Sequence, residues 1–402
     1  MTLVSDLKLA SVDLTSGELA GETYHERLAE VAGEGELSWL AASPLAYIVL
    51  DHESAEFFLR SRSTAFPGRE IADLFGVTAG RLREQIDTNI LNQQGDRHRR
   101  LRALVGGSFT PRAADRWRPV MRAFLGRLWS VAEPRHACDF VSAFARPYPA
   151  LTIAAVLGAP EADAPQLQQW SSLVQRQFDI RALGSQLPEL EQAATELYDY
   201  VEKLLAMRAR QPGDDLLSAL LAAEESGDRL SHEECVYLVL NVIAGGVDTT
   251  QAQLSHALRI FAARPDQWEA LRADPALVPA AVQEVLRYEP ITPFTARICL
   301  AEVEHRGVTF PAGTIVAVCS ERGNREQPGG EEFDITARRD GRLLTFGAGA
   351  HFCLGANLAR AELEEALSFL APRMRGLEAA GPVVLGNLEG IYGVDALPLR
   401  WR

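Results

Sequence analysis

Lysine is almost missing from this chain. Lys8 and Lys203 are the only two, so arginine carries nearly all of the positive charge. The 54 acidic residues outnumber the 40 basic ones, and the net charge is −14 at pH 7. Nucleic acids and anionic membranes would repel such a chain, so we expect neither as its main partner.

Cysteine is also scarce, with five residues spread widely over the chain: Cys138, Cys235, Cys299, Cys319 and Cys353. An odd, scattered set forms neither a disulfide framework nor a zinc-ligand spacing. This usage favours a reducing compartment, so we expect a cytoplasmic protein.

Targeting segments and membrane spans are not apparent in the sequence. Residues 1–14 contain no basic leader followed by an apolar core. The longest apolar run, 236–247, contains Asn241 and is too short to cross a bilayer. We therefore expect a soluble protein that makes no membrane contact.

No linker, low-complexity segment or internal repeat divides the 402 residues, which predicts one domain over 1–402, and we expect a monomer. A hydrophobic content of 47% and a charged content of 23% are ordinary for a globular enzyme. Helical patterns dominate, and short β runs are predicted at 45–50 and within 303–319. The expected fold class is mainly α with a small β-rich region.

One long helix is predicted from Ser231, which forms a capping box with Glu234, to about residue 263. Its middle holds Gly245 and Gly246, which cost a helix about 1 kcal/mol each relative to alanine. Two interpretations remain open for these glycines: close packing against a neighbouring helix, or room for a bound group.

A second helix is predicted between Asp274, as N-cap, and Pro290. Glu284 and Arg287 lie three residues apart on one of its faces. On a surface, such a pair is worth well under about 1 kcal/mol.

The stretch from Phe346 to Arg360 carries the most chemical information. It places Cys353 among glycines, and a helical pattern follows from Leu354 to about residue 370. Glycine allows sharp bends and close approach, and a helix N-terminus favours a thiolate. Such a thiolate suits the axial position of a heme iron, although a lone Cys-x-Gly is more often a buried structural cysteine.

The full pattern resembles the cysteine-ligand signature of the cytochrome P450 monooxygenases, and Ala359 and Arg360 match its usual continuation in bacterial members. The resemblance extends from about residue 90 to the C-terminus, and residues 1–40 match weakly. It implies a cytochrome P450 fold and a heme b whose iron binds Cys353. The matching signature positions are Phe346, Gly347, Gly349, His351, Cys353 and Gly355, and all of these except Gly349 are expected to bind the heme.

The resemblance also assigns roles in the long helix. Ala244 and Gly245 are expected to border the heme, and Asp248 and Thr249 to be the catalytic residues. Oxygen activation requires two protons at a buried site, so an acid beside an alcohol suits the chemistry. Thr250 points about 100° away around the helix and is expected to pack.

Four cationic or ionisable residues match the family's heme-propionate ligands: His98, Arg102, Arg297 and His351. His98 and Arg102 share a helix face at i and i+4. The arginine fork suits the carboxylates of a buried macrocycle.

Glu284 and Arg287 match the family's buried Glu-x-x-Arg pair, which braces the segment leading to the cysteine loop. Relatives usually have an arginine where this chain has Glu332. Arg325 is therefore the candidate for the third member of this structural set.

Substrate contacts are expected by resemblance at Val242, Ile291, Phe294 and Ile391. The sequence fits ordinary core positions equally well for these residues.

The implied reaction inserts one oxygen atom of O2 into a small organic substrate, usually by hydroxylation, in secondary-metabolite biosynthesis or catabolism. Electrons are expected from NAD(P)H through a ferredoxin reductase and a ferredoxin, because no flavin or iron–sulfur motif is present. Arg97, Arg99 and Arg100 offer a basic patch for an acidic donor. Two alternatives remain: peroxide-driven, coupling or other atypical oxidation in the same fold, and a non-catalytic heme-binding or scaffold protein.

Overall fold

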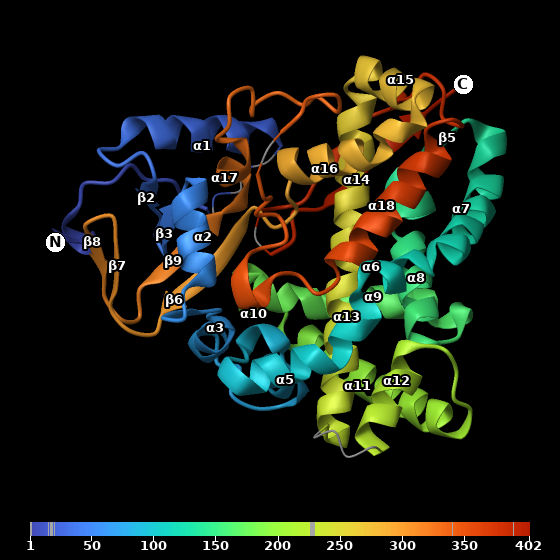
Figure 1. Cartoon of the computed structure of the whole chain (residues 1–402), viewed down its shortest axis with the longest axis horizontal. Coiled ribbons are helices and arrows are strands. Elements are labelled where there is room, and N and C mark those ends of the chain that lie inside the picture. The colour runs from blue at the N-terminus through green and yellow to red at the C-terminus, as the bar shows by residue number, and fades with distance from the viewer. Residues whose placement is uncertain are drawn as a thin grey trace. The chain divides into compact units, whose positions relative to one another are not determined.

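The computed structural model describes residues 2–14, 16, 19, 21–225, 230–339, 341–388 and 390–402 (Figure 1). The chain forms two compact units. The first comprises 1–67, 283–353 and 385–393, and the second comprises 68–282, 354–384 and 394–402.

The first unit contains most of the β structure. Its elements are β1 (Thr2–Leu3), α1 (Glu22–Glu34), β2 (Leu40–Ala42), β3 (Tyr47–Val49), α2 (His52–Arg60), β4 (Thr64–Ala65), β6 (Phe294–Cys299), β7 (Val303–His305), β8 (Val308–Phe310), β9 (Ile315–Cys319) and α17 (Ser320–Arg325). Two elements, α16 (Val278–Tyr288) and β11 (Val384–Leu385), begin in the second unit and end in the first.

The second unit is mainly helical. Its elements are α3 (Gly68–Leu74), α4 (Arg81–Thr88), α5 (Gly95–Gly106), α6 (Pro111–Asp115), α7 (Arg118–Ala132), β5 (Ala137–Asp139), α8 (Pro147–Leu157), α9 (Ala164–Gln175), α10 (Ile180–Ser185), α11 (Leu187–Arg210), α12 (Leu216–Glu225), α13 (His232–Gly246), α14 (Asp248–Ala262), α15 (Pro265–Ala273), α18 (Ala356–Leu370), β10 (Glu378–Ala379), β12 (Val394–Ala396) and β13 (Pro398–Arg400). The predicted fold class, mainly α with a β-rich region, is confirmed.

A five-stranded sheet of order β2-β3-β9-β6-β4 organises the first unit. Within this sheet, β3 and β9 pair in parallel, and the other neighbouring strands pair antiparallel. Alternate residues of β9 enter two separate cores: Val316 and Val318 pack in one, and Ala317 and Cys319 in the other. Because successive strand side chains point to opposite faces, this continuous apolar strand is buried on both sides.

The predicted long helix is interrupted. The capping box of Ser231 and Glu234 starts α13 as expected. The helix ends at Gly246, however, and α14 begins at Asp248 after Val247, whose φ and ψ are −91° and −64°. Figure 1 shows both helices in yellow. The two glycines lower the stability of the helix at this point. The Thr249 hydroxyl donates a hydrogen bond to the Gly245 carbonyl oxygen at 2.6 Å, in competition with the backbone amide that a continuous helix would use.

Other predicted boundaries lie close to the observed ones. Asp274 caps a short 3-10 turn, Pro275–Leu277, by accepting from the amide of Ala276, and α16 follows at Val278. β7 and β8 form an antiparallel hairpin. The helix after the cysteine loop begins at Ala356 rather than at Leu354.

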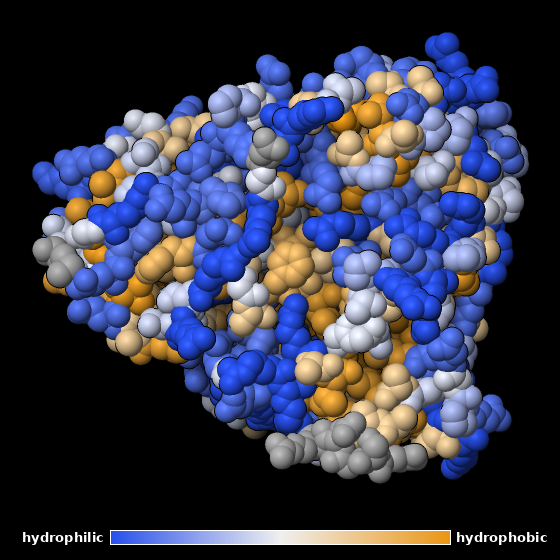
Figure 2. Space-filling view, in the orientation of Figure 1, coloured by the Kyte–Doolittle hydropathy of each residue, from blue (hydrophilic) through white to orange (hydrophobic). Residues whose placement is uncertain are grey.

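The surface drawn in Figure 2 is mostly hydrophilic, with smaller apolar areas between the polar side chains. Among the described residues, no helix is long and apolar enough to cross a membrane.

Candidate active site

The loop before α18 presents Cys353 at the surface of the first unit, where the residue is exposed. Its backbone amide donates to the Phe346 carbonyl at 2.8 Å. Gly347 and Gly349 have φ values of +69° and +70°, which favour glycine. A Cβ on Gly349 would lie 3.1 Å from the Cα of Arg60, so this position also lacks space for a side chain.

The other cysteines have different surroundings. Burial raises the pKa of the Cys235 thiol to about 12 and that of Cys299 to about 11. Such thiols stay protonated and are poor metal ligands. All five cysteines are free, and Cys353 alone is exposed.

Glu284 and Arg287 form the expected buried pair, with Nε–Oε2 and Nη2–Oε1 distances of 2.7 and 2.8 Å. Their side chains are only 5% and 4% exposed. Arg287 also donates to the backbone carbonyls of Gly330 and Glu332, at 2.6 and 2.7 Å. The pair therefore holds the segment after α17 against α16.

The prediction that Arg325 is the third member of this set is wrong, because Arg339 takes that place. The Arg339 Nε lies 3.3 Å from Glu284 Oε2, and its Nη2 donates to the Glu332 carbonyl at 3.0 Å. Arg325 instead pairs at 3.0 Å with Glu321, one turn earlier on α17. A close carboxylate on the same helix outcompetes a distant one.

A chain of hydrogen bonds links α16 and α17 to the cysteine loop. Asn324 accepts from the Leu344 amide at 2.8 Å and donates to the Thr345 hydroxyl at 2.9 Å. Thr345 in turn donates to the Leu286 carbonyl at 2.6 Å, and the Gly347 amide donates to Leu344 at 2.7 Å. Sequence reasoning missed these polar residues, which fix where the loop starts.

Arg297 lies on β6 with only 6% of its surface exposed. Within the described residues, its guanidinium has one hydrogen-bond acceptor, the Ala296 carbonyl at 2.9 Å. Burial lowers the pKa of Arg297 to about 10. A buried cation that lacks a carboxylate partner is costly, and an anionic ligand would offset that cost.

In the second unit, His98 and Arg102 lie on α5 as predicted, and His98 is 3% exposed. Burial lowers the pKa of His98, and the positive charges of Arg102 and Arg99 lower it further. An anion beside this face would reverse that effect, so the electrostatics suit a carboxylate ligand.

The predicted basic patch on α5 is partly neutralised. Arg100 binds both carboxylate oxygens of Glu234, one at 2.9 Å, and so ties α5 to α13. Arg99 pairs with Asp96, and Arg97 lies 3.8 Å from Glu234. Arg100 is thus structural, and Arg99, with 72% of its side chain exposed, is the most accessible cation of the three.

Of the two glycines before the helix break, one fits close packing against a neighbouring helix and the other fits room for a bound group. A Cβ on Gly246 would lie 2.5 Å from Cδ1 of Ile153, so Gly246 allows close packing with α8. A Cβ on Gly245 would meet nothing within 4 Å, so Gly245 faces open space. Ala244, directly before it, is buried.

Asp248 and Thr249 open α14 directly after the break. The Ser172 hydroxyl, on α9, donates to Asp248 Oδ1 at 2.6 Å. Burial nevertheless raises the pKa of Asp248, although the hydrogen bond from Ser172 and the charges of Arg176 and Arg146 lower it. This carboxyl therefore holds its proton to a higher pH than an ordinary aspartate.

Comparison with known proteins decides which family carries this arrangement. The sequence model of cytochrome P450 matches residues 21–370. The chain belongs to the cytochrome P450 family. It is 36% identical to the luteothin monooxygenase of Streptomyces thioluteus over 92% of each chain. It is 34% identical to the mycinamicin IV hydroxylase/epoxidase of Micromonospora griseorubida, over 79% of this chain and 81% of that protein.

Solved structures agree with this P450 assignment. The crystal structure of CalO2 has a TM-score of 0.89 and 30% identity, and the match covers 98% of this chain and 99% of that one. CxnD, a P450 for C–S bond formation in chuangxinmycin biosynthesis, has a TM-score of 0.86 and 28% identity, over 98% and 97% of the chains. The protein is therefore a P450 monooxygenase, and its family implies a heme cofactor.

The residues of this P450 fit a heme. The exposed Cys353 on its glycine loop suits the iron, as the chemistry of a thiolate donor requires. The incompletely paired Arg297 suits a propionate, and so does the positive face of α5. His351 lies partly buried in the short 3-10 turn Gly349–His351, two residues before the cysteine.

A second acid in this P450 was missed by sequence reasoning. Glu362 on α18 is 1% exposed, and Thr250 donates to its Oε2 at 3.4 Å. Burial raises the pKa of Glu362 well above its ordinary value, although the Thr152 and Thr250 hydroxyls lower it. Thr250 packs inside the unit as predicted. The available signal was helical spacing, since Glu362 is one turn from the core residues Leu358 and Ala366.

The residues expected to contact substrate are at least partly buried. Val242 is 9% exposed on α13, and Ile291 is 8% exposed after α16. Phe294 and Ile391 are half-buried. Within the first unit, the amide of Tyr392 donates to the Ile291 carbonyl at 2.8 Å, which joins two of the predicted segments.

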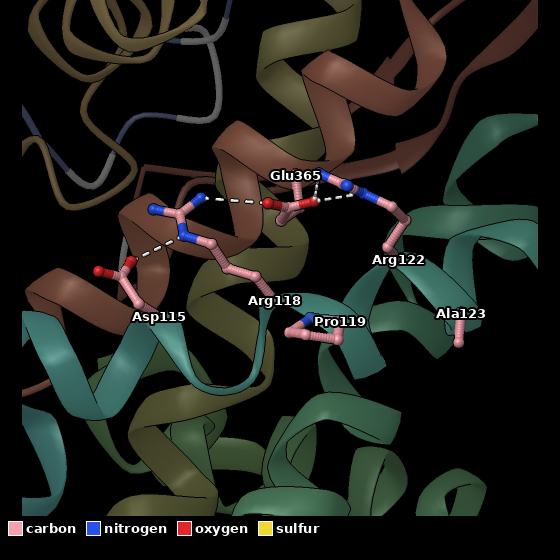
Figure 3. Close-up of a pocket in the computed structure, with 6 residues that line it drawn as sticks. All are labelled: Asp115, Arg118, Pro119, Arg122, Ala123 and Glu365. Carbon is pink, nitrogen blue, oxygen red and sulfur yellow. Dashed lines mark hydrogen bonds and ion pairs between the residues drawn. The ribbon is translucent and has the colours of Figure 1, made fainter.

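A surface hollow of about 560 Å³ lies in the second unit beside α18 (Figure 3). Arg118 binds Asp115 at 2.7 Å, and Arg118 and Arg122 both bind Glu365. The charged groups around the hollow are paired with each other. They hold α18, the helix that follows the cysteine, against α7, and we assign them this supporting role.

Proposed function

We propose that this P450 inserts one atom of O2 into a small organic substrate, most often by hydroxylation. The supporting observation is the Asp248–Thr249 pair, in which burial raises the pKa of the acid and the adjacent Gly245 faces open space. The relatives named for luteothin and mycinamicin IV support a substrate from secondary metabolism.

The heme-holding residues that we propose match the family position by position. Cys353 binds the iron, and the propionates bind His98, Arg102, Arg297 and His351. Ala244 and Gly245, together with Phe346, Gly347 and Gly355, border the ring. Bound heme b would supply the iron at which O2 is reduced.

Protons reach the reaction through the chain's own acid. Burial raises the pKa of Asp248 and so favours its protonated form over that of an ordinary aspartate, and the Ser172 hydroxyl keeps the carboxyl in one orientation. The Thr249 hydroxyl donates to the Gly245 carbonyl, so its oxygen lone pairs stay available to accept a hydrogen bond from water. An acid and an alcohol on consecutive residues can therefore pass a proton along.

Electrons come, in this proposal, from NAD(P)H through a ferredoxin reductase and a ferredoxin. Arg99 is the accessible cation of α5 that would attract an acidic donor. The five free cysteines support a cytoplasmic location. We further propose that the two compact units act as one functional domain, since the family match spans both.

A coupling oxidation is the second candidate. The structural neighbour CxnD is named for C–S bond formation, so related chains with this fold support more than hydroxylation. Product analysis separates the candidates, because hydroxylation adds one oxygen atom to the substrate and coupling adds none.

The test is spectral and then catalytic. A carbon monoxide difference spectrum of the reduced protein should show the thiolate–heme band, and Cys353→Ala should abolish it. Cys138→Ala is the matched control, since that thiol is half-buried and lies outside the loop. A wild-type protein without this band would refute the assignment of Cys353. Turnover of a secondary-metabolite panel with NADPH, ferredoxin and reductase, and separately with hydrogen peroxide, then identifies the electron source.

A further inference from the structure

A buried cluster of charged groups in the first unit has no role in the proposed chemistry. It comprises Glu289, Glu321 and Arg325 with His25 from α1, and these residues are 1%, 0%, 4% and 8% exposed. His25 Nδ1 lies 2.8 Å from Glu321 Oε1, and Nε2 lies 3.2 Å from Glu289 Oε2. The adjacent Tyr24 donates to Glu289 Oε1 at 2.7 Å.

The charge balance of this cluster depends on His25. The buried carboxylates of Glu289 and Glu321 flank the imidazole, so a proton on each ring nitrogen lets His25 donate to both of them. Burial alone would lower the pKa of His25, but the hydrogen bonds to Glu289 and Glu321 outweigh that effect and raise it. Arg325, 3.2 Å from Nε2, opposes the protonation and does not reverse the direction.

The same part of α1 contacts both segments expected to line the substrate. Glu289 lies two residues before Ile291, so its two bonds to α1 fix the start of the 289–294 segment. The Gly21 amide, at the N-cap of α1, donates to the Tyr392 hydroxyl at 2.7 Å, and the Tyr24 and Tyr392 rings lie edge to face at 5.5 Å. The Tyr392 amide in turn holds the Ile291 carbonyl.

We propose that Tyr24 and His25 are positioning residues that set the shape of the substrate-facing wall formed by Ile291 and Ile391. This inference rests on the proposed function, under which those two residues line the substrate. The start of α1 thereby becomes part of what determines specificity, through the protonated imidazole of His25; sequence reasoning expected only a weak family match there, but the family model already matches from residue 21.

The proposal has a pH signature with a defined sign. The folded-state pKa of His25 is raised above its ordinary value of 6.5. The stabilisation that its charge contributes is therefore complete below about pH 6.5 and is lost as pH rises through the raised pKa. The charged and titratable groups that the described residues place around it are Glu289, Glu321, Arg325, the Tyr24 hydroxyl and Tyr288, whose ring centroid lies 6.0 Å from that of His25.

The experiment compares two iron ligands that share an imidazole ring and differ by one phenyl substituent. Imidazole and 4-phenylimidazole both bind the ferric iron of the holoenzyme, but only the phenyl ring reaches the wall. We expect His25→Gln to weaken 4-phenylimidazole relative to imidazole by about tenfold at pH 6, as for the loss of one charge-assisted hydrogen bond. The ratio of the two dissociation constants, each calculated for the neutral form of the free ligand, should vary with pH in the wild type and be flat in the variant.

The control is His232→Gln, because His232 also has a raised pKa beside Glu202 and Glu224 but lies on α13. Tyr392→Phe removes the acceptor for the Gly21 amide and should change the same ratio if His25→Gln does not fold. An unchanged ratio in the variants that fold, or equal weakening of both ligands, would overturn the proposal. Failure here leaves the carbon monoxide band intact, whereas failure of the proposed function removes it from the wild type.

Discussion

The helical unit contains two pairs that each combine an acid with an alcohol. One pair consists of consecutive residues and the other of two residues in contact, and their surroundings differ. Asp248 precedes Thr249 at the break between α13 and α14, where Ser172 binds its carboxyl and Gly245 faces open space. Glu362 meets Thr250 one residue further along α14, but the carboxyl is 1% exposed. Burial raises the pKa of both acids.

The difference lies in which groups can exchange a proton. The charges of Arg176 and Arg146 lower the pKa of Asp248, and that of Asp395 raises it, so the carboxylate form has charged groups near it. The groups that modulate the pKa of Glu362 are two hydroxyls, so its charged form has little support. A raised pKa alone therefore does not mark a catalytic acid: access and a charged surrounding decide.

The largest expected effect separates the two alcohols. Asp248→Asn and Thr249→Ala should each lower product formation by about a hundredfold, the contribution typical of a positioned proton donor. Thr250→Ala should change it less than about twofold, because that hydroxyl serves packing. Product formed and hydrogen peroxide released per NADPH give the measurement. Equal losses in Thr249→Ala and Thr250→Ala would erase the distinction between the pairs.

The next effect concerns stability. Because burial raises the folded-state pKa of Glu362, the folded chain binds more protons than the unfolded one between the ordinary carboxyl pKa of 4.5 and the raised pKa. The free energy of unfolding should then fall as pH rises, by up to about 1.4 kcal/mol per unit. Glu362→Gln should flatten this fall in denaturant titrations between pH 5 and 8. The surface-side variant Glu364→Gln, on the same helix, should retain the wild-type slope.

The adjacent glycines offer a smaller contrast. Gly245→Ala should stabilise the helix by up to about 1 kcal/mol through helix propensity. It should also weaken ligand binding at the iron, because the new methyl group enters open space. Gly246→Ala meets Ile153 and should destabilise the chain by about 1 kcal/mol or more. Thermal unfolding and imidazole titration read out the two effects, and identical behaviour of both variants would contradict the assignment.

The smallest expected effect is a shift of the pH profile. Ser172→Ala removes a hydrogen bond that lowers the pKa of Asp248, so the limb of turnover governed by this acid should move to higher pH by less than about one unit. Ser171→Ala is the control, because the Ser171 hydroxyl binds the Ile243 carbonyl instead. A profile that does not move would mean that Ser172 only orients the carboxyl.

Local sequence patterns predicted several features well. The capping box at Ser231, the Glu284–Arg287 pair and the helix after Cys353 all depend on residues a few positions apart. Their geometry follows from helical spacing alone.

Features that depend on residues far apart in the sequence could not be predicted from it. Two glycines do not show whether a helix bends or breaks, and here the Thr249 hydroxyl accompanies the break. Arg339 lies 55 residues after Glu284, so no local rule could select it over Arg325. The raised pKa of Glu362 depends on tertiary burial, which the sequence does not specify residue by residue.

Arg297 makes the stability of the folded protein depend on which anions are present. Within the described residues its guanidinium has one backbone acceptor, so the folded chain carries a cation that it does not neutralise by itself. Any anion that binds there favours the folded state by mass action, and the melting temperature rises with its concentration. Without such an anion the folded state loses this stabilisation, so the chain should unfold at a lower temperature and be cleaved sooner by proteases.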